Sequence, residues 1–297
     1  MTRHRAAYAA LFVLALIWGY NWVVMKIALA YAPPFKFAAL RAGGAAIFML
    51  LLLRMRHKPL RPPMPARVAW LGLFQTIGFV SLTSFALYLG HAGMTAVLVY
   101  TMPFWVLILA VPLLGETLSG LKLTAGALGF VGLICILQPW NHPPDLTSTL
   151  LATGAGLDWA VAVVIAKKIR VDDTWQLVAV NAWQLVLGSA ALAVAAILVP
   201  APPIRWAPAF DVALAYNVFL GTSVAWLLWL FILQRLPAGS SGLSALVIPV
   251  VGVLSAWIQL GDRPGRWEAA GIAVVIAALG LLTLADRRSV RRLTARQ

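Results

Sequence analysis

Three side chains near the N-terminus combine aromatic rings with an amide group. Trp18, Asn21 and Trp22 lie three and four positions apart, and residues at this spacing are neighbours on one face of an α-helix. An amide between two indoles could bind a zwitterion while the rings stack on an aromatic side chain. The alternative is an interfacial aromatic belt with a packing amide.

Asp158 and Trp159 repeat this combination in the second half of the chain, where the letters GLDW loosely match the earlier GYNW. An ionisable group at membrane depth is costly and usually functional. Asp158 could meet a substrate amine or carry a proton. It could instead pair with Lys26 or Arg41 for structural reasons. The match makes the two segments candidate faces of one substrate site.

A third candidate group contains Tyr88, His91 and Tyr100. These residues fall near the outer ends of two expected helices. A histidine there could couple transport to protons, because its pKa lies near physiological pH. The alternative is a solvated histidine in a glycine-containing turn. We treat all three as candidate substrate-binding residues.

A further set of residues recurs with one spacing in both halves. A proline is followed twelve positions later by glycine and then an acidic residue, at Pro103, Gly115 and Glu116 and, 146 positions on, at Pro249, Gly261 and Asp262. The prolines fall inside expected spans and should kink them, as gating hinges or as fixed bends. The glycines and acids are expected to be structural, with each acid interacting with the N-terminal dipole of the helix that follows it. Glu116 could also pair with Lys167 or Lys168.

The composition places these residues in a membrane. Hydrophobic residues make up 62% and charged residues 11%, against roughly 45–50% and about 25% in soluble domains. Segments of about 20 apolar residues cross a bilayer as helices. Ten such segments are expected, at 8–30, 34–53, 68–89, 92–114, 121–138, 149–168, 174–199, 208–234, 239–260 and 267–285. A cleaved N-terminal signal is a weaker alternative for the first.

Positive charge predicts the orientation. With the N-terminus inside, 17 of the 23 lysine and arginine residues lie on the cytoplasmic side of ten spans, as the positive-inside rule requires. Both termini are therefore expected in the cytoplasm, with the chain in the plasma membrane, the inner membrane of a bacterium. The net charge of +14 is explained by topology and lipid contact, so nucleic acid is not an expected partner.

The duplicated block predicts two related halves, at residues 1–140 and 141–297. Each half has five expected helices, an odd number, so the halves enter the membrane from opposite sides. The predicted fold is an all-α polytopic membrane protein with ten transmembrane helices in an inverted 5+5 repeat. This arrangement commonly supports alternating access to a site between the halves.

These features together resemble a known family. The WGYNW run at 18–22 and the two proline-to-acid blocks are similar to EamA-type members of the drug/metabolite transporter superfamily. Asp262 departs from the family's usual glutamate. Within the superfamily, length and aromatic-rich helices are similar to YddG-type exporters of aromatic amino acids. The resemblance implies that helices 5 and 10 stand at the back, and that helices 1, 3, 4, 6, 8 and 9 line a central cavity.

The expected function is a secondary transporter that exports small metabolites, with aromatic and other neutral amino acids preferred. Nucleobases, drugs or nucleotide sugars are the alternative substrates. A membrane-embedded enzyme is a weaker alternative, because no catalytic cluster of acids, histidines and nucleophiles is evident. Cys135 is the one cysteine, and no nucleotide motif is present, so no cofactor and no metal site are expected. Proton coupling and oligomeric state stay open.

Overall fold

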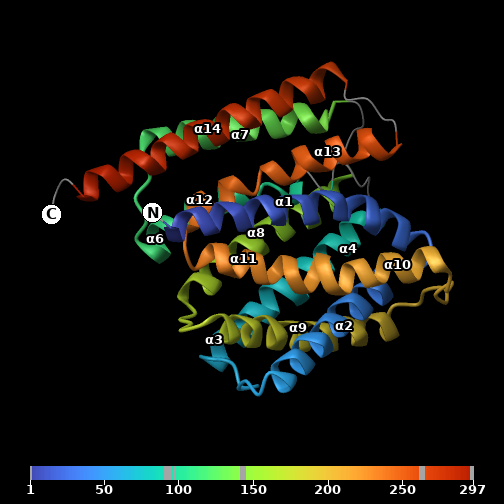
Figure 1. Cartoon of the computed structure of the whole chain (residues 1–297). Helices are drawn as coiled ribbons and strands as arrows, with labels where there is room; N and C mark the ends of the chain where they lie inside the picture. The colour runs from blue at the N-terminus through green and yellow to red at the C-terminus, as the bar shows by residue number, and fades with distance from the viewer. Residues whose placement is uncertain (1, 90–94, 96–97, 141–144, 261–264, 295–297) are drawn as a thin grey trace.

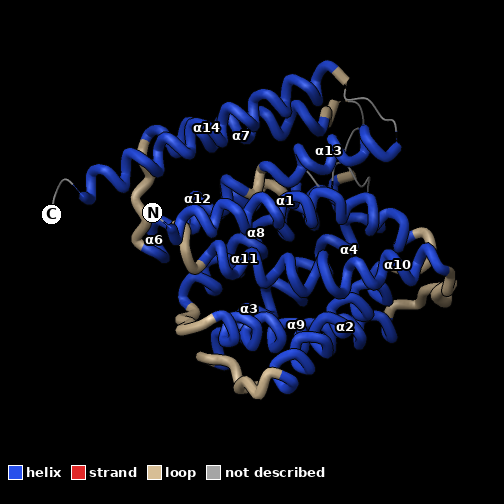
Figure 2. Tube along the Cα trace, in the orientation of Figure 1, coloured by secondary structure: helices blue, strands red, loops and turns tan. Residues whose placement is uncertain are grey.

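The computed structural model describes residues 2–89, 95, 98–140, 145–260 and 265–294, and all regular structure in these ranges is helical (Figures 1 and 2). The first half contains α1 (Thr2–Leu29), α2 (Pro34–Met55), α3 (Pro65–Leu71), the π-helix η1 (Gly72–Gly78), α4 (Phe79–Leu89), α6 (Met102–Leu114) and α7 (Gly120–Leu137). The second half contains α8 (Leu146–Lys168), α9 (Thr174–Leu198), α10 (Pro208–Tyr216), the π-helix η2 (Asn217–Val224), α11 (Ala225–Leu233), α12 (Ala238–Ser244), α13 (Val247–Leu260) and α14 (Arg266–Thr294).

The membrane character of the chain is confirmed. Within the described ranges, nine helical segments are long and apolar enough to cross a bilayer. The remaining expected span, 92–114, is represented by the shorter apolar helix α6, because the residues before it are only partly described. The predicted boundary between the halves borders residues 141–144, which lie outside the described residues, so that boundary stays a prediction.

The two halves share their helical irregularities. The π-helices η1 and η2 interrupt the third and eighth spans at positions that are 145 and 146 residues apart at their two ends. The fourth and ninth spans are also interrupted at matching positions, in this case by turns at Tyr100-Thr101 and at Ala245-Leu246. Irregularities at matching positions of both halves support the duplication predicted from the sequence.

Helix packing also follows the repeat. In the first half, α1 packs against α13 and α11, and in the second half its counterpart α8 packs against α6 and α4. Two equivalent pairs close the molecule at opposite edges, α2 with α9 and α7 with α14 (Figure 1). Exchange of partners between the halves is the packing expected of an inverted repeat. The pairing of α7 with α14 matches the expected position of helices 5 and 10.

Two glycines allow the central helices to approach each other. A Cβ atom on Gly156 of α8 would lie 3.0 and 3.1 Å from the carbonyl oxygens of Leu98 and Val99. On α1, a Cβ atom on Gly19 would lie 2.5 Å from Cγ1 of Val251 in α13. Side chains larger than hydrogen would force each pair apart, as at other close helix crossings in membranes. The equivalence of the GYNW and GLDW segments therefore has a packing basis.

The repeated prolines occupy helix beginnings, which differs from the expected mid-helix kinks. Pro103 lies in the first turn of α6, immediately after the turn at residues 100–101. Pro249 is the third residue of α13, after the turn at residues 245–246. First-turn backbone N–H groups have no partner within their own helix, so proline costs little there. The bends result from interrupted helices, and the prolines begin the segments that follow.

Candidate functional site

A small cavity lies between the two halves. It has a volume of about 80 Å³ and is lined by Trp18, Asn21, Trp22, Met25, Arg41, Phe79, Val80, Thr83, Ser84, Val99, Tyr100, Trp159 and Trp226. These residues come from α1, α2, α4, the turn before α6, α8 and α11. The described lining includes helix 2 and no residue of helix 9, which differs from the set that the resemblance implied. A ligand pocket is usually about 300–1,000 Å³, so the cavity must widen to hold an aromatic amino acid.

Aromatic rings from both halves form the cavity wall. The ring centroid of Trp18 lies 5.7 Å from that of Trp159 and 4.9 Å from that of Trp226, with edge-to-face geometry. Phe79 lies 5.1 Å from Trp159, and Tyr100 lies 6.4 Å from it. These separations are typical of favourable aromatic pairs. The cluster therefore joins the aromatic residues that the sequence placed on two separate faces.

Hydrogen bonds fix two of the indoles. Nε1 of Trp18 donates to the carbonyl oxygen of Gly221 at 3.0 Å, and Nε1 of Trp22 donates to the hydroxyl of Tyr100 at 3.2 Å. Gly221 belongs to the π-helix η2, and π-helical segments are often found at functional sites. The irregular segments of the fold therefore support the cavity in two ways, since η2 accepts the hydrogen bond of Trp18 and the turn before α6 supplies Tyr100 to the lining.

Several polar atoms at the cavity have no hydrogen-bond partner within the described structure. Oδ1 of Asn21, Oγ1 of Thr83 and Nε1 of Trp159 are all buried and unpaired. Buried polar groups are normally paired, because an unpaired group loses its hydration without compensation. Unpaired acceptors and donors beside a cavity are suited to bind a polar ligand.

Arg41 is the one charged side chain among the described lining residues. Its Nη1 atom donates to Oδ1 of Asn217 at 3.4 Å and to the sulfur of Met25 at 3.9 Å. Sequence reasoning did not include Arg41 as a site residue. The sequence feature that could have identified it is its place well inside an apolar span, because charged residues at membrane depth are usually functional.

Asp158 lies outside the cavity lining, although its neighbour Trp159 is part of it. The carboxylate of Asp158 packs against Gly78 of η1, and its Oδ2 atom has no partner within the described structure. The fold thus brings together at the cavity Trp18, Asn21, Trp22, Tyr100 and Trp159. Asp158 contacts Gly78 instead and does not line the cavity. Tyr88 lies in α4, but its side chain is outside the described residues, as are His91, Gly261 and Asp262.

The first acidic motif joins the two halves. Glu116 accepts hydrogen bonds from the backbone N–H groups of Ala238, at 2.5 Å, and Gly239, at 3.1 Å. These groups begin α12, so Glu116 interacts with the start of the ninth span and not with α7, the helix expected from the sequence. Ser119 caps α7 instead. Gly115 ends α6 with a φ angle of 67°, a left-handed conformation that glycine adopts readily.

A second polar cluster lies away from the cavity and has a structural character. Gln75 of η1 donates to Oε1 of Gln184 at 2.9 Å, and Gln184 donates to Oδ1 of Asn181 at 2.7 Å. Asn181 in turn donates to the carbonyl oxygen of Ser223 in η2 at 3.3 Å. This chain of hydrogen bonds connects the two π-helices through α9. Such networks stiffen membrane bundles.

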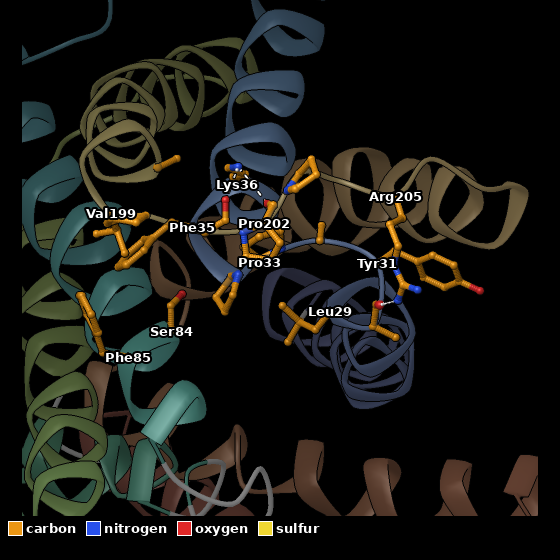
Figure 3. Close-up of a pocket in the computed structure, with 17 residues that line it drawn as sticks. Leu29, Tyr31, Pro33, Phe35, Lys36, Ser84, Phe85, Val199, Pro202 and Arg205 are labelled. Carbon is orange, nitrogen blue, oxygen red and sulfur yellow. Dashed lines mark hydrogen bonds between the residues drawn. The ribbon is translucent and has the colours of Figure 1, made fainter.

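A larger hollow of about 780 Å³ opens at the end of the bundle where α1 ends and α2 begins (Figure 3). Phe35, Ser84, Phe85 and Val199 line one side, and Ser84 also lines the central cavity. The two cations of this hollow are already hydrogen-bonded. Nζ of Lys36 donates to the carbonyl oxygens of Ala201 and Pro202 at 3.1 and 3.0 Å, and Nη2 of Arg205 donates to the carbonyl oxygen of Ala30. The two spaces share Ser84, and the unpaired atoms of Asn21, Thr83 and Trp159 lie at the central cavity.

Comparison with known proteins agrees with this architecture. Residues 5–138 and 146–284 each match the EamA-like transporter family. A solved crystal structure with 21% sequence identity superimposes with a TM-score of 0.81, covering 96% of this chain and 98% of that one. At this identity the structural likeness establishes the fold alone.

Several bacterial proteins are similar over most of their length. The uncharacterized transporter YoaV of Bacillus subtilis is 27% identical over 84% of this chain and 86% of its own. A probable amino-acid metabolite efflux pump of Escherichia coli is 26% identical over 94% of both chains. The uncharacterized inner membrane transporter YedA of Escherichia coli is 25% identical over 93% of this chain and 90% of its own.

Proposed function

The chain belongs to the EamA-like transporter family, and on that premise we propose that it exports small metabolites, principally aromatic and other neutral amino acids. The observation that carries the proposal is the aromatic cavity between the halves, with its unpaired polar atoms. Indole and phenyl rings suit an aromatic side chain. Unpaired polar groups suit the charged ends that every amino acid has.

We assign roles to the residues that the fold gathers. Trp18, Trp22 and Trp159 contact the substrate side chain, and Asn21 contacts the part common to all amino acids. Tyr100 positions Trp22 through their hydrogen bond. Tyr88 and His91 stay proposed contacts on the outer side, from their place in the sequence.

Transport proceeds by alternating access in this proposal. The turns at residues 100–101 and 245–246 divide the fourth and ninth spans, and interrupted helices are common at transporter sites. Pro103 and Pro249 begin the segments after these turns, so small rotations at the turns would move each segment as a unit. We place the chain in the bacterial inner membrane with both termini in the cytoplasm.

Other metabolites are the competing substrate class. Nucleotide sugars fit poorly, because a cavity of about 80 Å³ would have to expand far more for them than for an amino acid. The E. coli relative described as an amino-acid metabolite efflux pump supports amino acids over nucleobases. A membrane-embedded enzyme is disfavoured by the transporter character of the family and the relatives.

Uptake by proteoliposomes tests the proposal. Purified protein in liposomes should accumulate labelled phenylalanine and threonine above empty liposomes, and should not accumulate adenine. A second series with an imposed pH gradient distinguishes two mechanisms. The gradient should accelerate uptake if transport is coupled to protons, and it should leave the rate of uptake unchanged if transport is facilitated diffusion. Uptake of adenine with no uptake of any amino acid would refute the proposed substrate class.

A further inference from the structure

Arg41 carries an unneutralised positive charge at the central cavity. It lies within the apolar span Pro34–Met55 and is half-buried. Its guanidinium contacts the amide oxygen of Asn217, the sulfur of Met25 and the ring of Phe37, whose centroid is 5.8 Å away. All three partners are uncharged. In the part of the chain that the structure describes, no carboxylate lies within the 4.0 Å range of an ion pair with Arg41.

The hydrogen-bonding capacity of Arg41 is only partly used. Both of its bonds leave from Nη1, and their lengths of 3.4 and 3.9 Å are those of weak contacts. A guanidinium has five N–H donors, so the three on Nε and Nη2 remain. Two parallel N–H groups on one edge of a guanidinium match the two oxygens of a carboxylate. Arg41 is therefore equipped for a bidentate anion that the fold itself does not supply.

The sequence left open a pairing of Asp158 with Lys26 or Arg41, and in the described structure Asp158 makes no ion pair with Arg41. Its carboxylate packs against Gly78 and does not line the cavity, and its Oδ2 has no partner within the described structure. The same fold pairs other polar groups at membrane depth, such as Gln75 with Gln184 at 2.9 Å. A charge at membrane depth without an opposite charge beside it is costly. At the cavity, the charge of Arg41 has only uncharged partners.

We propose that Arg41 binds the carboxylate of the transported substrate and is the residue that selects carboxylates over other small metabolites. This inference rests on the proposed export of amino acids and refines it. A zwitterion also needs acceptors for its ammonium group, and Oδ1 of Asn21 and Oγ1 of Thr83 are unpaired acceptors on the same cavity. The cavity holds no described carboxylate, so cationic amines without a carboxylate are poor ligands.

Binding measurements with three related probes test this assignment. The probes are L-phenylalanine, L-phenylalaninamide, which lacks the carboxylate, and 3-phenylpropionate, which lacks the amine. The full chain in detergent is titrated with each, as wild type, Arg41→Gln, Arg41→Lys and Arg54→Gln. Arg54 is the matched control, because it lies on the same helix but is exposed at its other end.

The wild type should bind phenylalanine at least tenfold more tightly than phenylalaninamide, because charged hydrogen bonds contribute more than neutral ones. Arg41→Gln should reduce this preference to about twofold or less, chiefly by weakening phenylalanine. Arg41→Lys should keep a reduced preference, since it retains the charge and loses the bidentate edge. Arg54→Gln should behave as the wild type.

Equal wild-type affinity for phenylalanine and its amide overturns the assignment, and this comparison needs no variant to fold. An unchanged preference in folded Arg41→Gln overturns it as well. Binding of 3-phenylpropionate that depends on Arg41, with no binding of amino acids, supports the carboxylate site and refutes amino-acid export. Binding of neither phenylalanine nor 3-phenylpropionate refutes both.

Discussion

Replacement of Glu116 by glutamine should destabilise the protein through the contact between its halves. The carboxylate accepts two backbone hydrogen bonds, from Ala238 at 2.5 Å and Gly239 at 3.1 Å. Glutamine has one acceptor oxygen, and its NH₂ group would face a backbone N–H. The loss of a charged hydrogen bond costs about 1.5–3 kcal/mol. Removing the negative charge from a helix beginning adds about 0.3–1 kcal/mol.

These terms sum to roughly 2–4 kcal/mol in the free energy of unfolding. For chains of this size, 1 kcal/mol corresponds to about 2–4 °C in Tm, so Glu116→Gln should lower Tm by roughly 4–16 °C. Thermal unfolding in detergent, followed by tryptophan fluorescence, measures the shift.

Glu268→Gln is the matched control. Glu268 accepts a hydrogen bond from the backbone N–H of Gly265 at 2.8 Å, also at a helix beginning. Its side chain is half-buried, as is that of Glu116, but its hydrogen bond is exposed and lies within one half. Its replacement should lower Tm by less than about 3 °C, because water reaches this hydrogen bond and compensates for its loss. If both variants unfold within 2 °C of each other, the link between the halves has no special energetic role.

Three further predictions concern the site, the turns and the orientation. Trp22→Ala should weaken phenylalanine transport about two- to tenfold more than threonine transport, because aromatic stacking contributes about 0.5–1.5 kcal/mol. As a control, Trp257→Ala, at an exposed tryptophan, should change the transport of neither substrate. Equal loss of transport for both substrates in Trp22→Ala would contradict the stacking role. Pro103→Ala should slow transport more than it weakens equilibrium binding, with Tm within about 2 °C of wild type because the proline occupies a first helical turn; a large fall in Tm would indicate a packing role. For the orientation, single cysteines are placed at Met64, Asn141 and Ser289 in a Cys135→Ala background. In intact cells, an impermeant thiol reagent should label only the cysteine at position 141. Labelling at position 64 or 289 would show that the orientation is the opposite of the predicted one.

The sequence by itself determined the class of fold. Apolar length and the scarcity of charge require membrane helices, because a chain of this composition cannot bury so much apolar surface in a soluble core. The 146-residue repeat of proline, glycine and acid indicated two related halves, and the odd number of helices in each made the repeat inverted. These properties depend on local composition and spacing, which one sequence shows directly.

The tertiary structure decided which side chains meet. Thirteen tryptophans look alike in the sequence, yet Trp226 lines the cavity while Trp257 is 44% exposed. Arg41 lines the cavity and Asp158 does not, because the packing of the helices, including the contact of Asp158 with Gly78, sets where each side chain lies. The sequence also did not predict that Glu116 bonds to Ala238 at the start of α12, since the two residues lie 122 positions apart. Contacts between distant helices depend on packing geometry, which spacing along one helix does not encode.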